Sequence, residues 1–156
     1  MRIRVIAVGS RMPRWVLDSF GDYLTRLSST LKLTLVEVEP GPRGGGRTVQ
    51  QAMQAEAQRL LALLRKDEYV VALDEHGKEF TTRELASWLS ERMREGPDVS
   101  FLIGGPDGLS PDVIARCNLK WSLSRLTFPH ALVRVILAEQ IYRAHSVLTN
   151  HPYHRD

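Results

Sequence analysis

The sequence predicts an α/β fold in which a mostly parallel sheet is flanked by helices, and three observations carry this prediction. Extended apolar runs alternate along the chain with segments of helical spacing, which is typical of strands joined by crossover helices. Capping boxes and prolines precede the helical segments. The chain has 156 residues, which is enough for one hydrophobic core, so we expect a single domain over residues 1–156.

The first half of the chain contains three expected strands and two expected helices. Residues 2–8 form an apolar run, and residues 31–38 alternate as a half-buried strand does. Between these strands, Pro13 opens a helix whose apolar residues recur at helical spacing. Residues 48–65 start with a capping box and form the second helix. Residues 68–75 are rich in apolar side chains and form the third strand.

The second half continues the same alternation. Residues 81–93 begin with another capping box and carry one apolar face, and residues 98–104 form the fourth strand. Residues 110–117 begin with Ser-Pro-Asp, which starts a short helix. Residues 119–128 alternate as a strand before passing into an irregular run. A last, strongly apolar helix covers residues 129–148.

Composition excludes several classes of protein. Cys117 is the only cysteine, so an internal disulfide and a multi-cysteine zinc site are excluded. His151 and His154 have no carboxylate or cysteine beside them to complete a metal site, so we expect no metal. No apolar run reaches the ~18 residues of a membrane span, and the N-terminus lacks a secretory cleavage site. We therefore expect a cytoplasmic protein with no membrane contact. The formal net charge of +3 is compatible with an anionic partner such as nucleic acid.

Three strand ends differ from ordinary turns, at residues 72–78, 103–108 and 122–130. Open α/β sheets bind ligands at the carboxyl ends of their strands, so these segments are the predicted site. The glycines of the second segment permit unusual torsions and close approach of a ligand. The segment has no lysine and carries Asp107, which makes it a poor phosphate cradle. Glycine spacing alone fits a tight turn equally well.

Residues 40–47 form the most glycine-rich stretch of the chain. They lack the Lys-Ser/Thr ending of a P-loop and the spacing of a dinucleotide fingerprint. A mobile surface loop is therefore the favoured interpretation over a ligand site, with its arginines available to a polyanion.

The last helix and the C-terminal tail carry further candidates. Arg134 lies among apolar residues, where a charge needs a partner or a function. A structural ion pair is the favoured interpretation, and a functional role is the alternative. The tail contains an aromatic ring, a titratable ring and a group that can bind phosphate: Tyr153, His154 and Arg155. This set is suited to an unpaired RNA base. A frayed terminus without a function is the alternative.

Three segments together resemble one known family. They are LIGGPDGLSP at 102–111, SLSRLTFPHALVRVILAEQIYRA at 122–144 and NHPYHR at 150–155. Together with the N-terminal VIAVGSRMP and ALDEHGK, they are similar to the RlmH family of SPOUT methyltransferases over essentially the whole chain. The resemblance implies a SPOUT-type fold with a C-terminal trefoil knot and a homodimer. It also implies S-adenosylmethionine as methyl donor and methylation of N3 of a pseudouridine in 23S ribosomal RNA, within the ribosome.

The resemblance further implies the residues of the site. Backbone groups of three loops would hold the donor at Leu73, Gly104, Gly105, Leu123, Ser124, Arg125, Leu126, Thr127 and Phe128. The residues expected to bind the RNA are His130, Tyr153 and Arg155. The catalytic candidates are Arg134, Glu139, Arg143 and His154. Either arginine would stabilise negative charge or hold a phosphate, and His154 or Glu139 would accept the N3 proton.

Two other functions fit the residues alone. A flavodoxin-like or Rossmann-like domain would bind a phosphorylated cofactor at residues 103–108 and would not bind S-adenosylmethionine. A non-catalytic RNA-binding module would use the basic tail and would bind RNA without any methyl donor.

Overall fold

A computed structural model of the protein describes residues 1–27 and 31–155. Its elements are β1 (Arg2–Val8), α1 (Arg14–Arg26), β2 (Lys32–Val38), α2 (Val49–Leu63), β3 (Tyr69–Glu79), α3 (Thr82–Glu95), β4 (Val99–Ile103), α4 (Pro111–Arg116), β5 (Leu119–Ser122) and α5 (His130–Leu148). The strands form one sheet in the order β2-β1-β4-β3-β5, and all neighbouring strands are parallel. The predicted α/β class and order of elements are confirmed. The trefoil knot stays a prediction from the resemblance.

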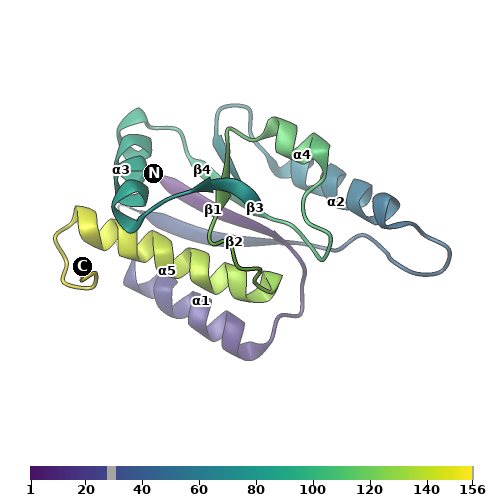
Figure 1. The fold of residues 1–156 in the computed structure, drawn as a ribbon, viewed down its shortest axis with the longest axis horizontal. Coiled ribbons are helices and arrows are strands. Elements are labelled where there is room, and N and C mark those ends of the chain that lie inside the picture. The colour runs from purple at the N-terminus through teal and green to yellow at the C-terminus, as the bar shows by residue number, and fades with distance from the viewer. Residues whose placement is uncertain (28–30, 156) are drawn as a thin grey trace.

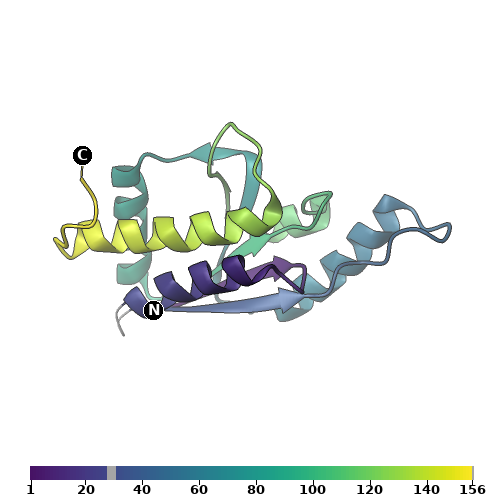
Figure 2. The same cartoon turned by 90° about the horizontal axis from the view of Figure 1, so that it is seen from below.

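The side chains of β1 show how both faces of the sheet are buried. Ile3, Val5 and Ala7 pack in a core with side chains of α1, α3 and α5. Ile6 and Val8 pack on the opposite face with side chains of α2 and α4. Figures 1 and 2 show α1 and α5 lying side by side along the sheet. Burial on both faces explains why β1 and β4 are mostly apolar.

The predicted helix-start signals are confirmed. Thr48 and Thr81 each form a capping box at the start of α2 and α3. The hydroxyl of Ser110 accepts a hydrogen bond from the backbone N–H of Val113 at the start of α4. α5 is 19 residues long, yet no helix of the described segments has both the length and the apolar character needed to cross a membrane.

β3 is longer than predicted. It does not end near Glu75 but continues to Glu79, with a bulge between Leu73 and Lys78 opposite Trp121 of β5. The bulge contains a local turn in which Asp74 Oδ1 accepts a hydrogen bond from the N–H of His76 at 2.8 Å. This local bond replaces the ladder across the inserted residues, so the strand resumes after them.

β5 is shorter than predicted, because the alternation over residues 119–128 does not continue as a strand beyond Ser122. Ser122 Oγ donates to the carbonyl of Ser124, and Ser124 Oγ accepts from the N–H of Leu126. These side-chain bonds to the backbone compete with strand pairing. The remaining residues form an irregular segment that leads into α5.

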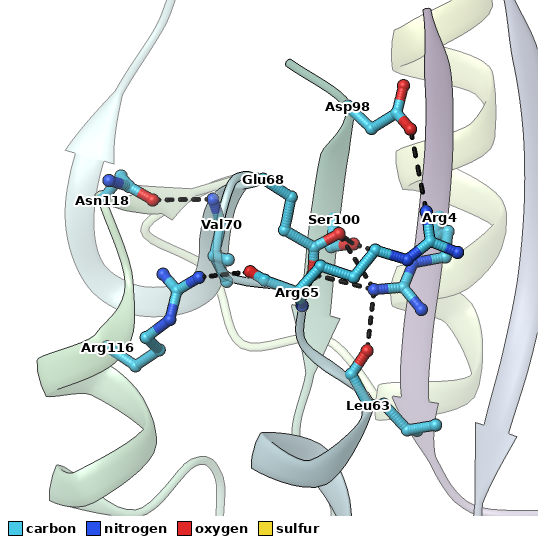
Figure 3. A network of polar contacts seen from close by, with 9 residues as sticks. All are labelled: Arg4, Leu63, Arg65, Glu68, Val70, Asp98, Ser100, Arg116 and Asn118. Atoms are coloured by element: carbon cyan, nitrogen blue, oxygen red, sulfur yellow. Dashed lines mark hydrogen bonds and ion pairs between the residues drawn. The ribbon is translucent and has the colours of Figure 1, made fainter.

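A buried ion pair ties β1 and β4 to the segment before β3 (Figure 3). The carboxylate of Glu68 accepts hydrogen bonds from Arg4 Nη2 at 2.8 and 2.9 Å and from Ser100 Oγ at 3.0 Å. Arg4 Nη2 also donates to the carbonyl of Leu63. The side chain of Glu68 is only 2% exposed. Loss of Arg4 would therefore leave a buried carboxylate without its counter-charge.

Replacing Arg4 by methionine should lower the free energy of unfolding by about 3 kcal/mol, the usual cost of breaking a buried pair from one side. Urea denaturation followed by circular dichroism measures this loss. Arg65→Ala is the matched control, because Arg65 is 60% exposed and its contact with Asp98 is 3.8 Å long. The control should cost less than ~0.5 kcal/mol. Equal losses in the two variants would contradict the assignment.

Candidate active site

A pocket of about 480 Å³ lies at the carboxyl end of the sheet. Its walls come from the bulge of β3, from residues 103–109 after β4, from residues 121–128 at β5 and beyond, and from the start of α5. These segments are the three unusual strand ends of the sequence. The volume falls in the range of small-ligand pockets, ~300–1,000 Å³.

Most of the predicted donor-binding residues line this pocket: Leu73, Gly104, Gly105, Leu123, Ser124, Leu126, Thr127 and Phe128. His130, predicted to contact RNA, lines it as well. Arg125 is not among the lining residues, and its side chain is 89% exposed, 3.8 Å from Glu79. Leu126 is 72% exposed although it lines the pocket. The segment after β5 therefore presents both a wall and an outward-facing surface.

The glycine corner, residues 104–108, is a tight turn that also forms a wall of the pocket. A Cβ on Gly104 would lie 2.6 Å from the carbonyl carbon of Gly108, and Gly108 itself has a φ of +79°. The N–H of Gly108 donates to the carbonyl of Gly105. A Cβ on Gly105 would meet the side chain of Val8 at 3.0 Å, toward the interior of the protein. The turn itself requires these glycines.

The charges on the pocket wall are negative. Three carboxylates, Asp74, Glu75 and Asp107, are among the lining residues. Within the described part of the chain, no lysine or arginine is among them. A phosphate group would be repelled here, whereas a neutral ring edge or a cation is suited to the wall. The arrangement argues against the phosphorylated-cofactor alternative.

Arg134 is not among the residues that line the pocket, and it makes the structural ion pair that the sequence favoured. Its guanidinium is 1% exposed, and it donates to Glu37 Oε2 and to the carbonyl of Gly9, both at 2.8 Å. Both acceptors lie at the carboxyl ends of neighbouring strands. The side chain therefore fixes α5 to the sheet, and its predicted direct role toward the reacting base gains no support from this geometry.

The other C-terminal candidates form a second group, the tail cluster, which consists of Glu139, Arg143, Tyr153 and His154. Glu139 Oε1 accepts hydrogen bonds from Arg143 Nη2 at 2.5 Å and from the phenol of Tyr153 at 3.0 Å. Arg143 Nη1 lies 3.1 Å from His154 Nδ1, and its guanidinium stacks 4.8 Å from the centre of the Tyr153 ring. The tail is thus held against α5 rather than frayed. Arg155 lies beside it, exposed.

Titration within the tail cluster follows from these contacts. Burial, followed by hydrogen bonds to Tyr23 and Glu139, raises the pKa of Tyr153 well above its usual value, so the phenol stays protonated. The hydrogen bond to Glu139 raises the pKa of Arg143. Because an arginine can only donate, His154 Nδ1 is the acceptor in its contact with Arg143 Nη1.

The pocket and the tail cluster do not meet within one chain. His130 and Glu139 are separated by roughly 14 Å along the axis of α5 at 1.5 Å per residue and lie on opposite sides of the helix. Figure 2 shows the tail at the far end of α5 from the segment that leads into it.

Neither a metal nor a cysteine nucleophile is built into the described residues. No group of three or more His, Cys, Asp or Glu side chains among them is arranged to hold a metal ion. Burial raises the pKa of the Cys117 thiol to about 11, which keeps it protonated.

Sequence reasoning missed two carboxylates near the site. Glu37 is the partner of Arg134, and Glu56 is a 2% exposed acid beneath Gly105. Glu56 had a visible signal, because it falls at helical spacing between Met53 and Leu60 on the apolar stripe of α2. Glu37 had none, since strand alternation alone does not indicate which helix covers a strand end.

Comparisons with known proteins agree with this geometry. A sequence family described as "Predicted SPOUT methyltransferase" matches residues 1–154. Two proteins named "Ribosomal RNA large subunit methyltransferase H" are similar to this chain over 155 residues, which is 99% of both chains in each case. The protein from Stenotrophomonas maltophilia is 49% identical to it, and the protein from Alkalilimnicola ehrlichii is 52% identical. A solved structure of a probable methylase family protein from Haemophilus influenzae shares the fold, with a TM-score of 0.56 and 14% identity over 99% of this chain and 70% of that one. The chain belongs to the SPOUT methyltransferase family, together with these large-subunit methyltransferases.

Proposed function

We propose that this protein is a homodimeric enzyme that transfers a methyl group from S-adenosylmethionine to N3 of a pseudouridine in 23S ribosomal RNA, within the ribosome in the cytoplasm. The observation that carries the proposal is the pocket with backbone-rich, acidic walls at the strand ends of a SPOUT chain. The names of relatives about half identical in sequence support the RNA substrate.

The residues of the pocket fit the donor. S-adenosylmethionine supplies a methyl group on a sulfonium cation, and Asp74 and Glu75 on the wall would face its positive charge. Gly104 and Gly105, with the segment Leu123–Phe128 and Leu73, would hold the donor through backbone groups and apolar contact. A pocket of this kind fixes the orientation of a reactant, which is the main requirement of an in-line transfer.

The tail cluster would bind the RNA base, supplied to each pocket by the second copy of the chain. Within one chain α5 keeps the two groups apart, whereas two copies related by a two-fold axis can place the tail of one beside the pocket of the other. Tyr153 offers a ring for stacking, and Arg143 and Arg155 offer positive charge to phosphate or to the deprotonated base. His130 would contact the RNA from the pocket side.

The N3 proton must leave as the methyl group arrives, and the tail cluster contains the groups for this step. Glu139 already binds Arg143 and Tyr153, so it orients both. His154 or Glu139 would accept the proton. Arg143 would then stabilise negative charge that develops on the base.

Two measurements test the proposal. Calorimetry should show binding of S-adenosylmethionine to the purified protein. Radiolabelled donor should then label 23S RNA in ribosomes from cells that lack the modification, and mass spectrometry should place the methyl group on N3 of a pseudouridine. No donor binding would refute the proposal, and RNA binding without transfer would favour the non-catalytic alternative.

Gly104→Ala should raise the Kd for S-adenosylmethionine about tenfold, because its Cβ overlaps the backbone of Gly108 and such overpacking costs ~1–3 kcal/mol. Gly21→Ala is the matched control, since a Cβ on this helical glycine of α1 meets nothing within 4 Å. Calorimetry compares the two variants after circular dichroism has established that both are folded. An unchanged Kd for Gly104→Ala would show that the turn is not part of the donor site.

Removal of residues 151–156 should abolish methylation while donor binding is retained, because the tail cluster lies away from the pocket. At a donor concentration well below the Kd, Gly104→Ala alone should keep about a tenth of wild-type activity and the truncated chain none. A mixture of the two chains should then reach about a quarter of wild-type activity, since half of the randomly formed dimers would contain one intact composite site. The methyl-transfer assay is run after the two chains are unfolded and refolded together. No recovery in a mixture that contains heterodimers would mean that each site is built from a single chain.

A further inference from the structure

We propose that Arg43 is a positioning residue of the donor site, which holds the glycine corner in place by joining Asp107 on the pocket wall to the buried carboxylate of Glu56. The inference rests on the proposed function, because it assigns the glycine corner to the donor. It gives the Gly-rich loop at residues 40–47 a role that its sequence alone does not reveal.

The guanidinium of Arg43 bridges two carboxylates from different parts of the fold. Its Nη1 donates to Glu56 Oε2 of α2 at 2.8 Å. Its Nε and Nη2 donate to Asp107 Oδ2 at 3.1 and 2.9 Å. The Nη1 group also reaches the carbonyl of Gly41 at 3.1 Å. One side chain therefore connects the loop, α2 and the glycine corner.

Glu56 makes this bridge rigid. Its side chain is 3% exposed, and its Oε2 accepts a further hydrogen bond from the N–H of Gly41 at 2.9 Å. Within the part of the chain that the structure describes, Glu56 Oε1 is buried without a hydrogen-bond partner. Such a carboxylate depends strongly on its remaining counter-charge, so Arg43 is held firmly. The bond to Glu56 is also the main cause of the raised pKa of Arg43.

The first residues of the loop pack against α2, which fixes the position of the Arg43 backbone. A Cβ on Gly41 would lie 2.1 Å from the carbonyl oxygen of Ala52, so only glycine allows the loop to approach α2 this closely. Beyond Arg43, Gly44 and Arg47 close an exposed turn. The favoured interpretation of a surface loop therefore applies to its tip, whereas its first residues are anchored.

The glycine corner needs an external support of this kind. Residues 106–108 are exposed, and the turn is closed by the bond from Gly108 N–H to the Gly105 carbonyl. Asp107 lies at its tip and lines the pocket. Glu56 lies beneath the same turn, with both carboxylate oxygens 3.5 Å from the position of a Cβ on Gly105. Arg43 and Glu56 thus hold the wall from outside and from below.

The test measures donor binding and kinetics in the full-length protein. Arg43→Ala should raise the Kd and KM for S-adenosylmethionine about fivefold, with the KM for ribosomes unchanged. Asp107→Asn removes the charge from the exposed arm of the bridge without uncovering Glu56, and it should give a similar change. Because the contact that Asp107→Asn weakens is already lost in Arg43→Ala, the double variant should bind the donor no more weakly than Arg43→Ala alone. Arg43→Lys keeps the positive charge but cannot bind two carboxylates at once through a planar guanidinium. Its Kd for the donor should therefore lie between those of the wild type and Arg43→Ala.

Arg47→Ala is the matched control, an exposed arginine of the same loop, and it should leave both KM values unchanged. An unaltered Kd for the donor in Arg43→Ala and Asp107→Asn would overturn the inference. Independent, multiplying effects of the two substitutions would do the same, since Asp107 would then act on the donor directly. A raised KM for ribosomes alone would make Arg43 an RNA contact instead. Failure of the wild-type protein to bind the donor would refute the proposed function and is recognised before any variant is compared.

Discussion

The buried guanidinium of Arg134 fixes α5 on the sheet, and both groups of candidate residues depend on the position of that helix. Its two hydrogen bonds reach Glu37 and the carbonyl of Gly9, at the carboxyl ends of β2 and β1. Sliding the helix would leave a charge unpaired among apolar side chains, at a cost of several kcal/mol. One turn before Arg134, the same anchor places His130 at the pocket. Further along, it places Glu139 and Arg143 beyond the reach of that pocket.

The pocket itself is shaped mainly by backbone. The bulge of β3, the glycine corner and the irregular segment after β5 each replace regular ladder bonds by local ones, such as Asp74 to His76 and Ser124 to Leu126. Each departure exposes backbone groups at the end of a strand, where a ligand can use them. Such a wall has few hydrogen bonds within itself. Charged contacts from neighbouring segments, such as that of Arg43 with Asp107, therefore help to fix its shape.

The strands, helices and caps could be predicted from the sequence because their signals are local: apolar periodicity, Thr48, Thr81 and the Ser-Pro pair at 110–111. The three strand ends of the pocket could be found because parallel strands end at one edge of a sheet. The bulge in β3 and the early end of β5 could not be predicted. In both places the alternating sequence pattern continues, but a few local hydrogen bonds between side chains and backbone interrupt the strand. Partners distant in sequence, such as Glu37 for Arg134 or Asp107 for Arg43, follow only from the three-dimensional packing.

The distribution of charge is consistent with the proposed two-chain site. The pocket wall carries Asp74 and Glu75, which suit a cationic donor but repel an RNA phosphate, whereas the charge of Asp107 is paired with Arg43. Arg143 in the tail cluster and the neighbouring Arg155 carry positive charge, which suits RNA. About 14 Å along α5 separates His130 at the pocket from Glu139 of the tail cluster. In the proposed dimer, association of two chains would therefore bring donor and base together.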